Sequence, residues 1–436
     1  MALPTIISMM VTSIYNIADT FFVSKISTQA TAAVGIVFTV MAIFQAIGFF
    51  FGYGTGTFIA IKLGAGKSED AKKMAITGFV YALAMSALIA LSAFIFITPL
   101  CRLLGCTPTV LPYAEDYLSP VLMGAPFIVG ALTLNVQIRQ QGNAAYAMFG
   151  IVSGAILNIC LDPLFIFTLG LGIRGAGIAT LLSQGVSFLI LLFMTTKGGN
   201  VRLSRYNFSR QNMFIREIFR GGTPSLTRQS LGSIATLLLN LSAAVYGDAA
   251  IAGMTIVTRL TFLVFAIVVG LGQGYQPLCS FSYGAGLYRR LISAFWFCSA
   301  IGTLFLTAVA VAGSIDPEAV IKIFRDDPEV MAIGGEALRL QLYAYPLGAV
   351  TMFSNMAMQS MNMTLRANIL SAARRGLFFI PFLMVLPNFY GLDGLKLCQP
   401  LADVCAFLVS MPVLFFTFRQ LSTSFHILKP EFEKIN

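Results

Sequence analysis

The sequence predicts an all-α integral membrane protein, with twelve transmembrane helices in two parallel-repeat six-helix lobes around a central cavity. Of its 436 residues, 57% are hydrophobic and only 11% are charged, whereas about 25% of residues are charged in soluble domains. Apolar stretches close to the roughly 20 residues that span a bilayer recur along the chain. They are continuous, which favours helices over the alternating pattern of a barrel. The second half also repeats the first at an offset of 220 residues.

The twelve spans follow one another along the chain. They are expected near residues 3–24, 33–55, 75–98, 118–138, 147–168, 175–195, 224–246, 253–275, 291–313, 340–361, 367–388 and 395–418. We expect an N-terminal six-helix lobe at 1–198, a cytoplasmic linker at 199–222, a C-terminal six-helix lobe at 223–418 and a cytoplasmic tail at 419–436. In the linker, Ser209 is placed to cap a short amphipathic helix that ends at the Gly221-Gly222 pair.

The distribution of Lys and Arg sets the orientation of the spans. Nineteen of these residues, Arg374 and Arg375 among them, lie in one set of loops and the tail, and seven lie on the opposite side. The positive-inside rule therefore predicts cytoplasmic termini, in a multi-pass protein of the cell (inner) membrane. The same rule accounts for the net charge of +10, so nucleic acid is not an expected partner. Because the first span starts close to Met1 without a basic region or cleavage site, we expect a cytoplasmic leader before it and no signal peptide.

Matching residues carry the repeat between the two halves. The pairs include Pro4 with Pro224, Gly64-Ala65-Gly66 with Gly284-Ala285-Gly286, Pro108 with Pro328, and Pro126 with Pro346. Each half holds six spans, an even number, so the repeats are parallel and an axis along the membrane normal should relate them. Channels more often assemble from several chains around one pore, whereas a monomer with two lobes suits alternating access.

Two acidic residues lie inside predicted spans of the first half, where an ionisable group costs about 2.5–3.5 kcal/mol. Asp19 follows Asn16 by three residues and shares its helix face. Asp162 follows Asn158 by four residues and also shares its face. Pro163 removes a backbone donor and disfavours helix geometry at Asp162, so carbonyls and a carboxylate can point at one small cation. Two alternatives stay open: Asp19 at the external interface, and Asp162 as the cap of a kink.

Two further polar residues lie one turn apart in the sixth span. They are Thr180 and Gln184, although a threonine that bonds back to its own helix is the usual case. The candidate coupling pocket comprises Asp19, Asn158, Asp162 and Thr180, with Asn16 and Gln184 as auxiliary residues. Two carboxylates in a low dielectric cannot easily both stay ionised, so Asp19 and Asp162 would hold a proton or a cation such as Na⁺.

The second half lacks this pattern, because at the same offset Asp19 meets Leu239 and Asp162 meets Phe382. Its own ionisable residues inside predicted spans are Arg228, Arg259 and Asp403. The arginines can snorkel to the interfaces. Asp403 either pairs with one of them or acts as an auxiliary cation ligand.

Enzymatic and structural-metal chemistry have little support in the sequence. The seven cysteines form no CxxC and His426 is the only histidine, so neither a Cys-His pair nor a metal cluster is indicated. Cys101 and Cys106 share one predicted external loop, either as free thiols or as a disulfide. There is no HExxH and no GxSxG, so we expect neither an enzyme nor an organic cofactor.

The most specific stretches are IYNIADTFFVSKIS, LNICLDPLFIF and GIRGAGIATLLSQ, with the GYGTG turn that precedes LGAGK. As a set, they resemble the multidrug and toxic compound extrusion (MATE) transporters, and the resemblance covers both halves. It implies an exporter driven by a proton or sodium gradient. In the branch with the cation site in the N-terminal lobe, the matching carboxylates are Asp19 and Asp162, with Asn158 and Thr180 as helpers. Pro4 resembles the proline at which the first helix of that branch bends.

The expected function is therefore secondary active multidrug export. We expect an antiporter that exchanges organic, often cationic and lipophilic, compounds for H⁺ or Na⁺ by alternating access, with hinges at Pro4 and Pro163. Its partners would be small organic substrates and the lipid bilayer. One alternative keeps the fold and flips or exports a lipid-linked or other metabolite. A channel or receptor is a third hypothesis.

Overall fold

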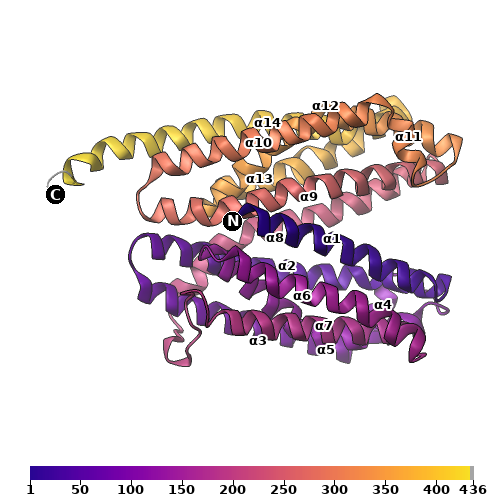
Figure 1. Ribbon diagram of the computed structural model, residues 1–436. Helices are drawn as coiled ribbons and strands as arrows, with labels where there is room; N and C mark the ends of the chain where they lie inside the picture. Colours follow the sequence, from indigo (N-terminus) through magenta and orange to yellow (C-terminus); the bar gives the residue numbers. More distant parts are fainter. Residues whose placement is uncertain (433–436) are drawn as a thin grey trace. The chain divides into compact units, whose positions relative to one another are not determined.

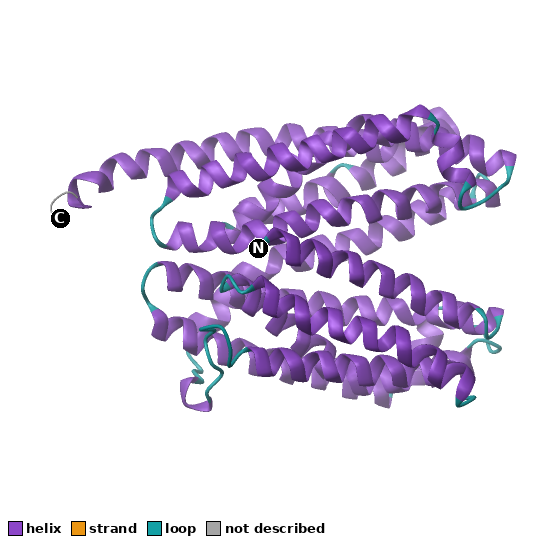
Figure 2. Cartoon of the chain, in the orientation of Figure 1, coloured by secondary structure: helices purple, strands orange, loops and turns teal. Residues whose placement is uncertain are grey.

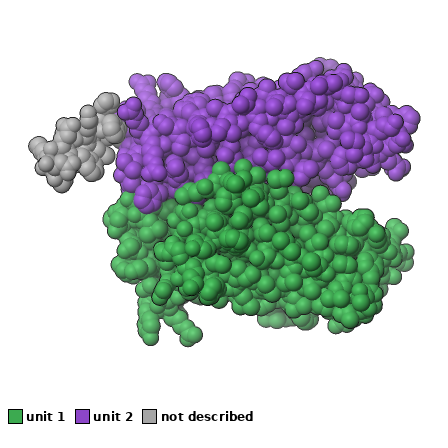
Figure 3. All heavy atoms as spheres, in the orientation of Figure 1, with its two compact units in different colours: residues 1–226 green, residues 227–436 purple. Residues whose placement is uncertain are grey.

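The computed structural model describes residues 1–432, with the side chains of Asn16 and of residues 424–432 outside the description. Within residues 1–432, the regular elements are helices (Figure 2). Internal contacts divide the chain into two compact units, residues 1–226 and residues 227–436 (Figure 3). We call them unit 1 and unit 2 and describe each one by itself.

Unit 1 holds the helices of the first half (Figure 1). They are α1 (Ala2–Ser24), α2 (Thr28–Gly64), α3 (Ser68–Ile95), α4 (Ile97–Leu103), α5 (Leu111–Gln140), α6 (Ala144–Pro163), the π-helix η1 (Leu164–Thr168), α7 (Gly172–Met194), the 3₁₀-helix η2 (Arg205–Asn207) and the start of α8 (Asn212–Ala244). α5 lies at the centre, since it packs against α2, α3, α6 and α7. Within α5, the 18-residue apolar stretch that could cross a membrane is accordingly 78% buried, the largest share among the candidate spans.

Unit 2 holds the rest of α8 and the helices that follow it. They are α9 (Asp248–Gly284), α10 (Tyr288–Ile315), α11 (Pro317–Lys322), α12 (Pro328–Ser360), α13 (Thr364–Ala372), the π-helix η3 (Ala373–Leu377) and α14 (Phe379–Phe432). α12 takes the central position here, packing against α9, α10, α13 and α14. α14 consists of two rods joined at Gly391, whose φ of 57° and ψ of −135° are not helical.

Local signals in the sequence start and end several of these helices. Ser27 caps α2, because its side chain accepts a hydrogen bond from the backbone N–H of Ala30 at 3.0 Å. Asp327 caps α12 in the same way. Gly66 and Gly286 follow α2 and α9 with φ of 73° and 70°, a left-handed conformation that favours glycine after a helix.

The predicted parallel repeat is confirmed at the level of the helices. α2 and α9 each have 37 residues, and α3 and α10 each have 28. The short helices α4 and α11 follow them at matching places. The turn before the last span of each half also recurs, since Gly172 and Gly391 have φ of 56° and 57°. The halves therefore share one order of helices, turns and breaks.

The predicted twelve spans are also found among the described residues. Nine helical stretches are long and apolar enough to cross a membrane. One of them, Thr364–Thr423, contains the break at Gly391 and so forms two rods. The more polar helices α8 and α12, each of 33 residues, complete the set. The fold class of an all-α integral membrane protein is thus confirmed.

The helix predicted in the linker is different in the structure. It was expected to end at Gly221-Gly222, but α8 begins at Asn212 and continues through both glycines and Pro224 to Ala244. A Cβ atom on Gly222 would overlap the carbonyl oxygen of Phe50 in α2. The glycines therefore permit close approach of two helices, and they do not act as a helix terminator.

Candidate functional site

The polar residues predicted from the first half lie on three neighbouring helices of unit 1. α1 carries Asp19, α6 carries Asn158 and Asp162, and α7 carries Thr180. α6 packs against both α1 and α7, so these side chains come together although more than a hundred residues separate Asp19 from the other three. Asp19 is 9% exposed, and the other three are exposed by 1% or less. We call these four residues the carboxylate site.

Two hydrogen bonds and one electrostatic interaction connect the carboxylate site. The Tyr117 hydroxyl on α5 donates to Oδ2 of Asp19 at 3.4 Å. The Asn158 amide donates to Oγ1 of Thr180 at 3.5 Å. Asp19 and Asp162 are close enough to act on each other electrostatically. Asp19 is therefore buried, on a helix that packs against the one that carries Asp162, and it does not lie at an exposed surface.

Two tyrosines of this site were missed by the sequence analysis. Tyr117 reaches Asp19 from α5, and Tyr15 lies one turn before Asp19 on α1. The Tyr15 side chain lies near those of Thr180 and Gln184, which brings the predicted auxiliary residue Gln184 to the edge of the site. The N-x-x-D spacing drew attention to Asn16, whose side chain lies outside the described residues. The spacing of Tyr15 and Asp19 at i and i+4 was an available signal.

Several oxygen atoms of the carboxylate site are buried without a hydrogen-bond partner. They are Oδ1 of Asp19, Oδ1 of Asn158 and both carboxylate oxygens of Asp162. Buried polar atoms in folded proteins nearly always have a partner, and an unpaired one is costly in a low dielectric. An arrangement of this kind suits an occupant that supplies positive charge, either a proton on a carboxylate or a small cation.

The donor set also limits which cation would suit the site. Among the side chains that the structure describes, no group of three or more His, Cys, Asp or Glu gathers at one place. A cation at Asp19 and Asp162 would therefore complete its coordination with the neutral oxygens of Asn158 and Thr180. Carboxylate, amide and hydroxyl oxygens suit hard cations such as Na⁺ better than soft transition metals.

The two predicted hinge prolines occupy different helical contexts. Pro163 is the last residue of α6, and the next five residues form the π-helix η1. The irregular backbone therefore follows Asp162, which itself remains in regular helix. Pro4 lies in the first turn of α1, where proline removes no helical hydrogen bond. Their roles as hinges remain predictions.

In unit 2, Asp403 has partners that the sequence analysis did not assign. It was expected to pair with Arg228 or Arg259 or to bind a cation, but its partner is Arg374, at 2.7 Å from Nε to Oδ1. The side chains of Gln341 and Gln399 also donate to Asp403, at 2.7 Å and 2.9 Å. The carboxylate is thus saturated by donors, which leaves an auxiliary cation-binding role without support.

The placement of Arg374 and Arg375 in a cytoplasmic loop is wrong. Both lie in η3, within the apolar stretch Thr364–Thr423. They were counted with the loops, although the predicted span at 367–388 contains both residues. The cysteines follow the simpler of the two open alternatives: Cys101 and Cys106 are free thiols.

Comparison with known proteins agrees with this architecture. The MatE family model matches residues 4–164 and 224–385, one stretch in each half. The multidrug export protein MepA of Staphylococcus haemolyticus (strain JCSC1435) is 26% identical over 413 residues, which cover 93% of this chain and 90% of that protein. The FAD transporter of Shewanella oneidensis is 26% identical over 410 residues, with coverage of 93% and 90%.

A solved structure agrees over nearly the whole chain. It is the outward-facing conformation of a multidrug resistance MATE family transporter of the MOP superfamily, which aligns with a TM-score of 0.89 and 27% identity. The alignment covers 97% of this chain and 95% of that one. Since the family model matches both halves, the chain belongs to the MatE family, the multidrug and toxic compound extrusion transporters, and is a multi-pass membrane transporter, not an enzyme.

Proposed function

We propose that this transporter exports organic compounds in exchange for H⁺ or Na⁺ that binds at the carboxylate site. The observation that carries the proposal is the set of buried carboxylate oxygens of Asp19 and Asp162 without partners. An exporter driven by an ion gradient needs an ion site whose occupancy changes between the two sides of the membrane. Two carboxylates in a low dielectric provide it, because their mutual repulsion is relieved only when a proton or cation is present.

The geometry also suggests how ion binding at the carboxylate site moves other parts of unit 1. Asp19 lies on α1. The 18-residue apolar stretch of this helix is only 18% buried, the smallest share among the candidate spans. A weakly packed helix can shift at low cost, since few contacts must break. Neutralisation of the pocket would let α1 pack more closely on α6, and loss of the ion would release it. Bending at Pro4 and at the irregular turn after Pro163 would accompany this movement and trigger substrate release.

The substrates we propose are small lipophilic organic compounds, often cationic. The support is the 26% identity to MepA, a multidrug export protein, over nearly the whole chain. We further propose a monomer, because two lobes in one chain suit alternating access. The Lys and Arg distribution supports an orientation in the inner membrane with both termini in the cytoplasm. Labelling of single cysteines introduced at Lys197 and Arg102 from either side would test the orientation, since these residues belong to the two opposite sets of loops.

The decisive experiment is dye efflux from proteoliposomes, driven separately by a pH gradient and by a Na⁺ gradient. Asp162→Asn and Asp19→Asn should abolish gradient-driven efflux while the protein stays folded and monodisperse. Asp116→Asn is the matched control, because this carboxylate is exposed near the start of α5. Normal efflux by the Asp162→Asn variant would exclude the carboxylate site as the coupling site. The gradient that drives transport identifies the ion.

A second candidate function is export of an anionic metabolite by the same fold. Two observations favour it: the 26% identity to an FAD transporter, and the two arginines of η3 inside an apolar stretch. Efflux of a cationic dye without efflux of anionic compounds from the same liposomes would exclude this candidate.

A further inference from the structure

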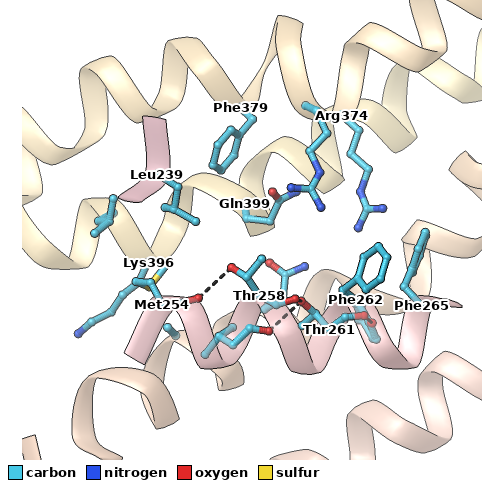
Figure 4. Close-up of a pocket in the computed structure, with 16 residues that line it drawn as sticks. Leu239, Met254, Thr258, Thr261, Phe262, Phe265, Arg374, Phe379, Lys396 and Gln399 are labelled. Atoms are coloured by element: carbon cyan, nitrogen blue, oxygen red, sulfur yellow. Dashed lines mark hydrogen bonds between the residues drawn. The ribbon is translucent and has the colours of Figure 1, made fainter. Parts of the chain in front are cut away.

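Unit 2 contains a cavity between α9, α12, η3 and α14. Its polar lining consists of Thr258, Thr261, Gln341, Tyr345, Arg374, Arg375, Lys396 and Gln399. Its apolar lining includes Leu239, Met254, Val257, Phe262, Phe265 and Phe379. In Figure 4, Arg374 and Phe379 face the cavity from one wall, and Thr258, Thr261 and Phe262 face it from α9 on the opposite wall. The cavity is thus lined both by charged hydrogen-bond donors and by aromatic rings.

Most of the charges in this lining are already neutralised. Arg374 forms a two-point contact with Asp403, through Nε at 2.7 Å and Nη2 at 3.3 Å. Its guanidinium also lies over the Phe265 ring, 4.4 Å from the centroid. The ammonium group of Lys396 binds Asp393 at 2.9 Å and also contacts Glu336. Neither cation therefore needs a ligand.

The uncharged polar groups are also occupied. The hydroxyls of Thr258 and Thr261 donate to carbonyl oxygens of their own helix, each at 2.8 Å. The Tyr345 hydroxyl donates to the carbonyl oxygen of Thr261. The amides of Gln341 and Gln399 donate to Asp403. The polar lining of the cavity is therefore partnered, apart from one residue.

That residue is Arg375. It forms no ion pair and no hydrogen bond with the side chains and backbone that the structure describes. The nearby carboxylate of Asp403 is held by Arg374 and two amides, and the like charge of Arg374 lies close to Arg375. Arg375 is half-buried. A guanidinium presents five N–H donors and stays charged, so partial burial without a counter-ion carries a cost. An anion in the cavity would remove this cost.

The position of Arg375 along its helix argues against simple snorkelling. The rod that runs from Thr364 to the break at Gly391 has Arg375 near its middle. At about 1.5 Å per residue, Arg375 lies roughly 16 Å from Thr364 and roughly 24 Å from Gly391. A bilayer core is about 30 Å thick, so a rod that spans it carries Arg375 in its inner part. An anion that enters the cavity would therefore be a suitable partner for Arg375.

The size of the cavity defines which part of a ligand enters. Its volume is about 60 Å³, and one buried water occupies roughly 10–15 Å³ on the same measure. The space therefore suits a carboxylate or phosphate group, and it is too small for a whole drug molecule. The exposed Phe262, with 61% of its surface accessible, extends an aromatic surface beyond this space for the apolar body of the ligand.

We propose that this cavity of unit 2 binds the carboxylate or phosphate group of an amphipathic organic anion, with Arg375 as its binding residue. The inference rests on the proposed function, because it adds organic anions to the compounds that the transporter accepts. It is independent of the carboxylate site, which lies in unit 1. Binding at Arg375 should therefore persist when the coupling carboxylates are neutralised.

The test is equilibrium binding of radiolabelled 2-naphthoate to the full chain in phosphatidylcholine nanodiscs. We expect saturable binding by the wild type, and about tenfold or more weaker binding by Arg375→Gln, as expected for loss of a charge-assisted contact. Arg375→Lys should keep most of the affinity, which excludes misfolding as the cause. Arg290→Gln is the matched control, because Arg290 is an exposed arginine of the same unit.

Three results would overturn the inference. The first is absence of saturable naphthoate binding by the wild type. The second is equal affinity in the wild type and Arg375→Gln. The third is equal affinity for naphthoate and for 2-naphthylmethylammonium, a cation of similar shape. A parallel series with phosphatidylglycerol distinguishes the source of the anion: abolition of naphthoate binding by this lipid would identify a lipid headgroup as the occupant and refute the assignment to a transported compound.

The same variants separate this inference from the proposed function. Asp162→Asn should lose gradient-driven efflux and retain naphthoate binding. If Arg375→Gln binds naphthoate normally while Asp162→Asn loses efflux, only the anion site fails. If Asp162→Asn exports dye normally while Arg375→Gln loses naphthoate binding, only the coupling site fails.

Discussion

The ion pair between Arg374 and Asp403 provides a quantitative test of the interior of unit 2. Four hydrogen bonds converge on this carboxylate, from Arg374 at 2.7 Å and 3.3 Å, Gln341 at 2.7 Å and Gln399 at 2.9 Å. The side chain of Asp403 is 1% exposed and that of Arg374 is 19% exposed. Asp403→Leu would leave a largely buried guanidinium without its counter-ion, together with two amides without acceptors.

The expected cost of this substitution follows from the burial of the pair. Breaking a buried ion pair from one side typically costs about 3–5 kcal/mol, and the partial exposure of Arg374 places this case near the lower end. A loss of about 3 kcal/mol raises the unfolding equilibrium constant roughly 150-fold. The double variant Asp403→Leu/Arg374→Met should be clearly more stable than Asp403→Leu, because replacing both charges by apolar groups is often close to neutral.

The assay is equilibrium unfolding in mixed detergent micelles, followed by circular dichroism as the fraction of SDS increases. Asp393→Asn on the same rod is the control, because Asp393 is 69% exposed in its pair with Lys396, and exposed pairs contribute about 0–1 kcal/mol. A cost below about 1 kcal/mol for Asp403→Leu would refute the reasoning. Equal stability of the single and double variants would also contradict it, since no coupling would exist between the two charges.

Two further predictions concern glycine packing and the carboxylate site. Gly175→Val and Gly394→Val should each destabilise the protein by about 1–3 kcal/mol in the same unfolding assay, because an added Cβ would meet backbone carbonyl groups at both positions. Gly185→Ala should be neutral by comparison, since its Cβ would lie 3.9 Å from the nearest atom, and a comparable loss there would remove the steric explanation. Tyr117→Phe deletes the donor to Asp19 at 3.4 Å, so it should change the ion concentration for half-maximal efflux severalfold without abolishing transport. An unchanged ion dependence would show that this contact does not tune the site.

Much of the fold was predictable because helices that span a membrane leave a clear pattern of apolar residues in the sequence. The bilayer demands continuous apolar stretches of nearly fixed length, so the spans, the all-helical class and the repeat at an offset of 220 residues can be read along the chain. Two of the carboxylate-site residues, Asn158 and Asp162, were identifiable for a similar reason. Residues four apart share a helix face whatever the rest of the protein does.

The contacts between helices were decided only by the tertiary structure. Nothing in the sequence spacing indicates that Tyr117 meets Asp19 or that Arg374 neutralises Asp403, because these pairs depend on which helix faces pack together. Charge counting also misplaced Arg374 and Arg375, since an arginine in a loop and an arginine within a helix carry the same letter. The sequence by itself determined the helices, the repeat and the residues that share one face. Packing between helices determined which charged side chains have neutralising partners and which, as at Asp162 and Arg375, have none among the residues that the structure describes.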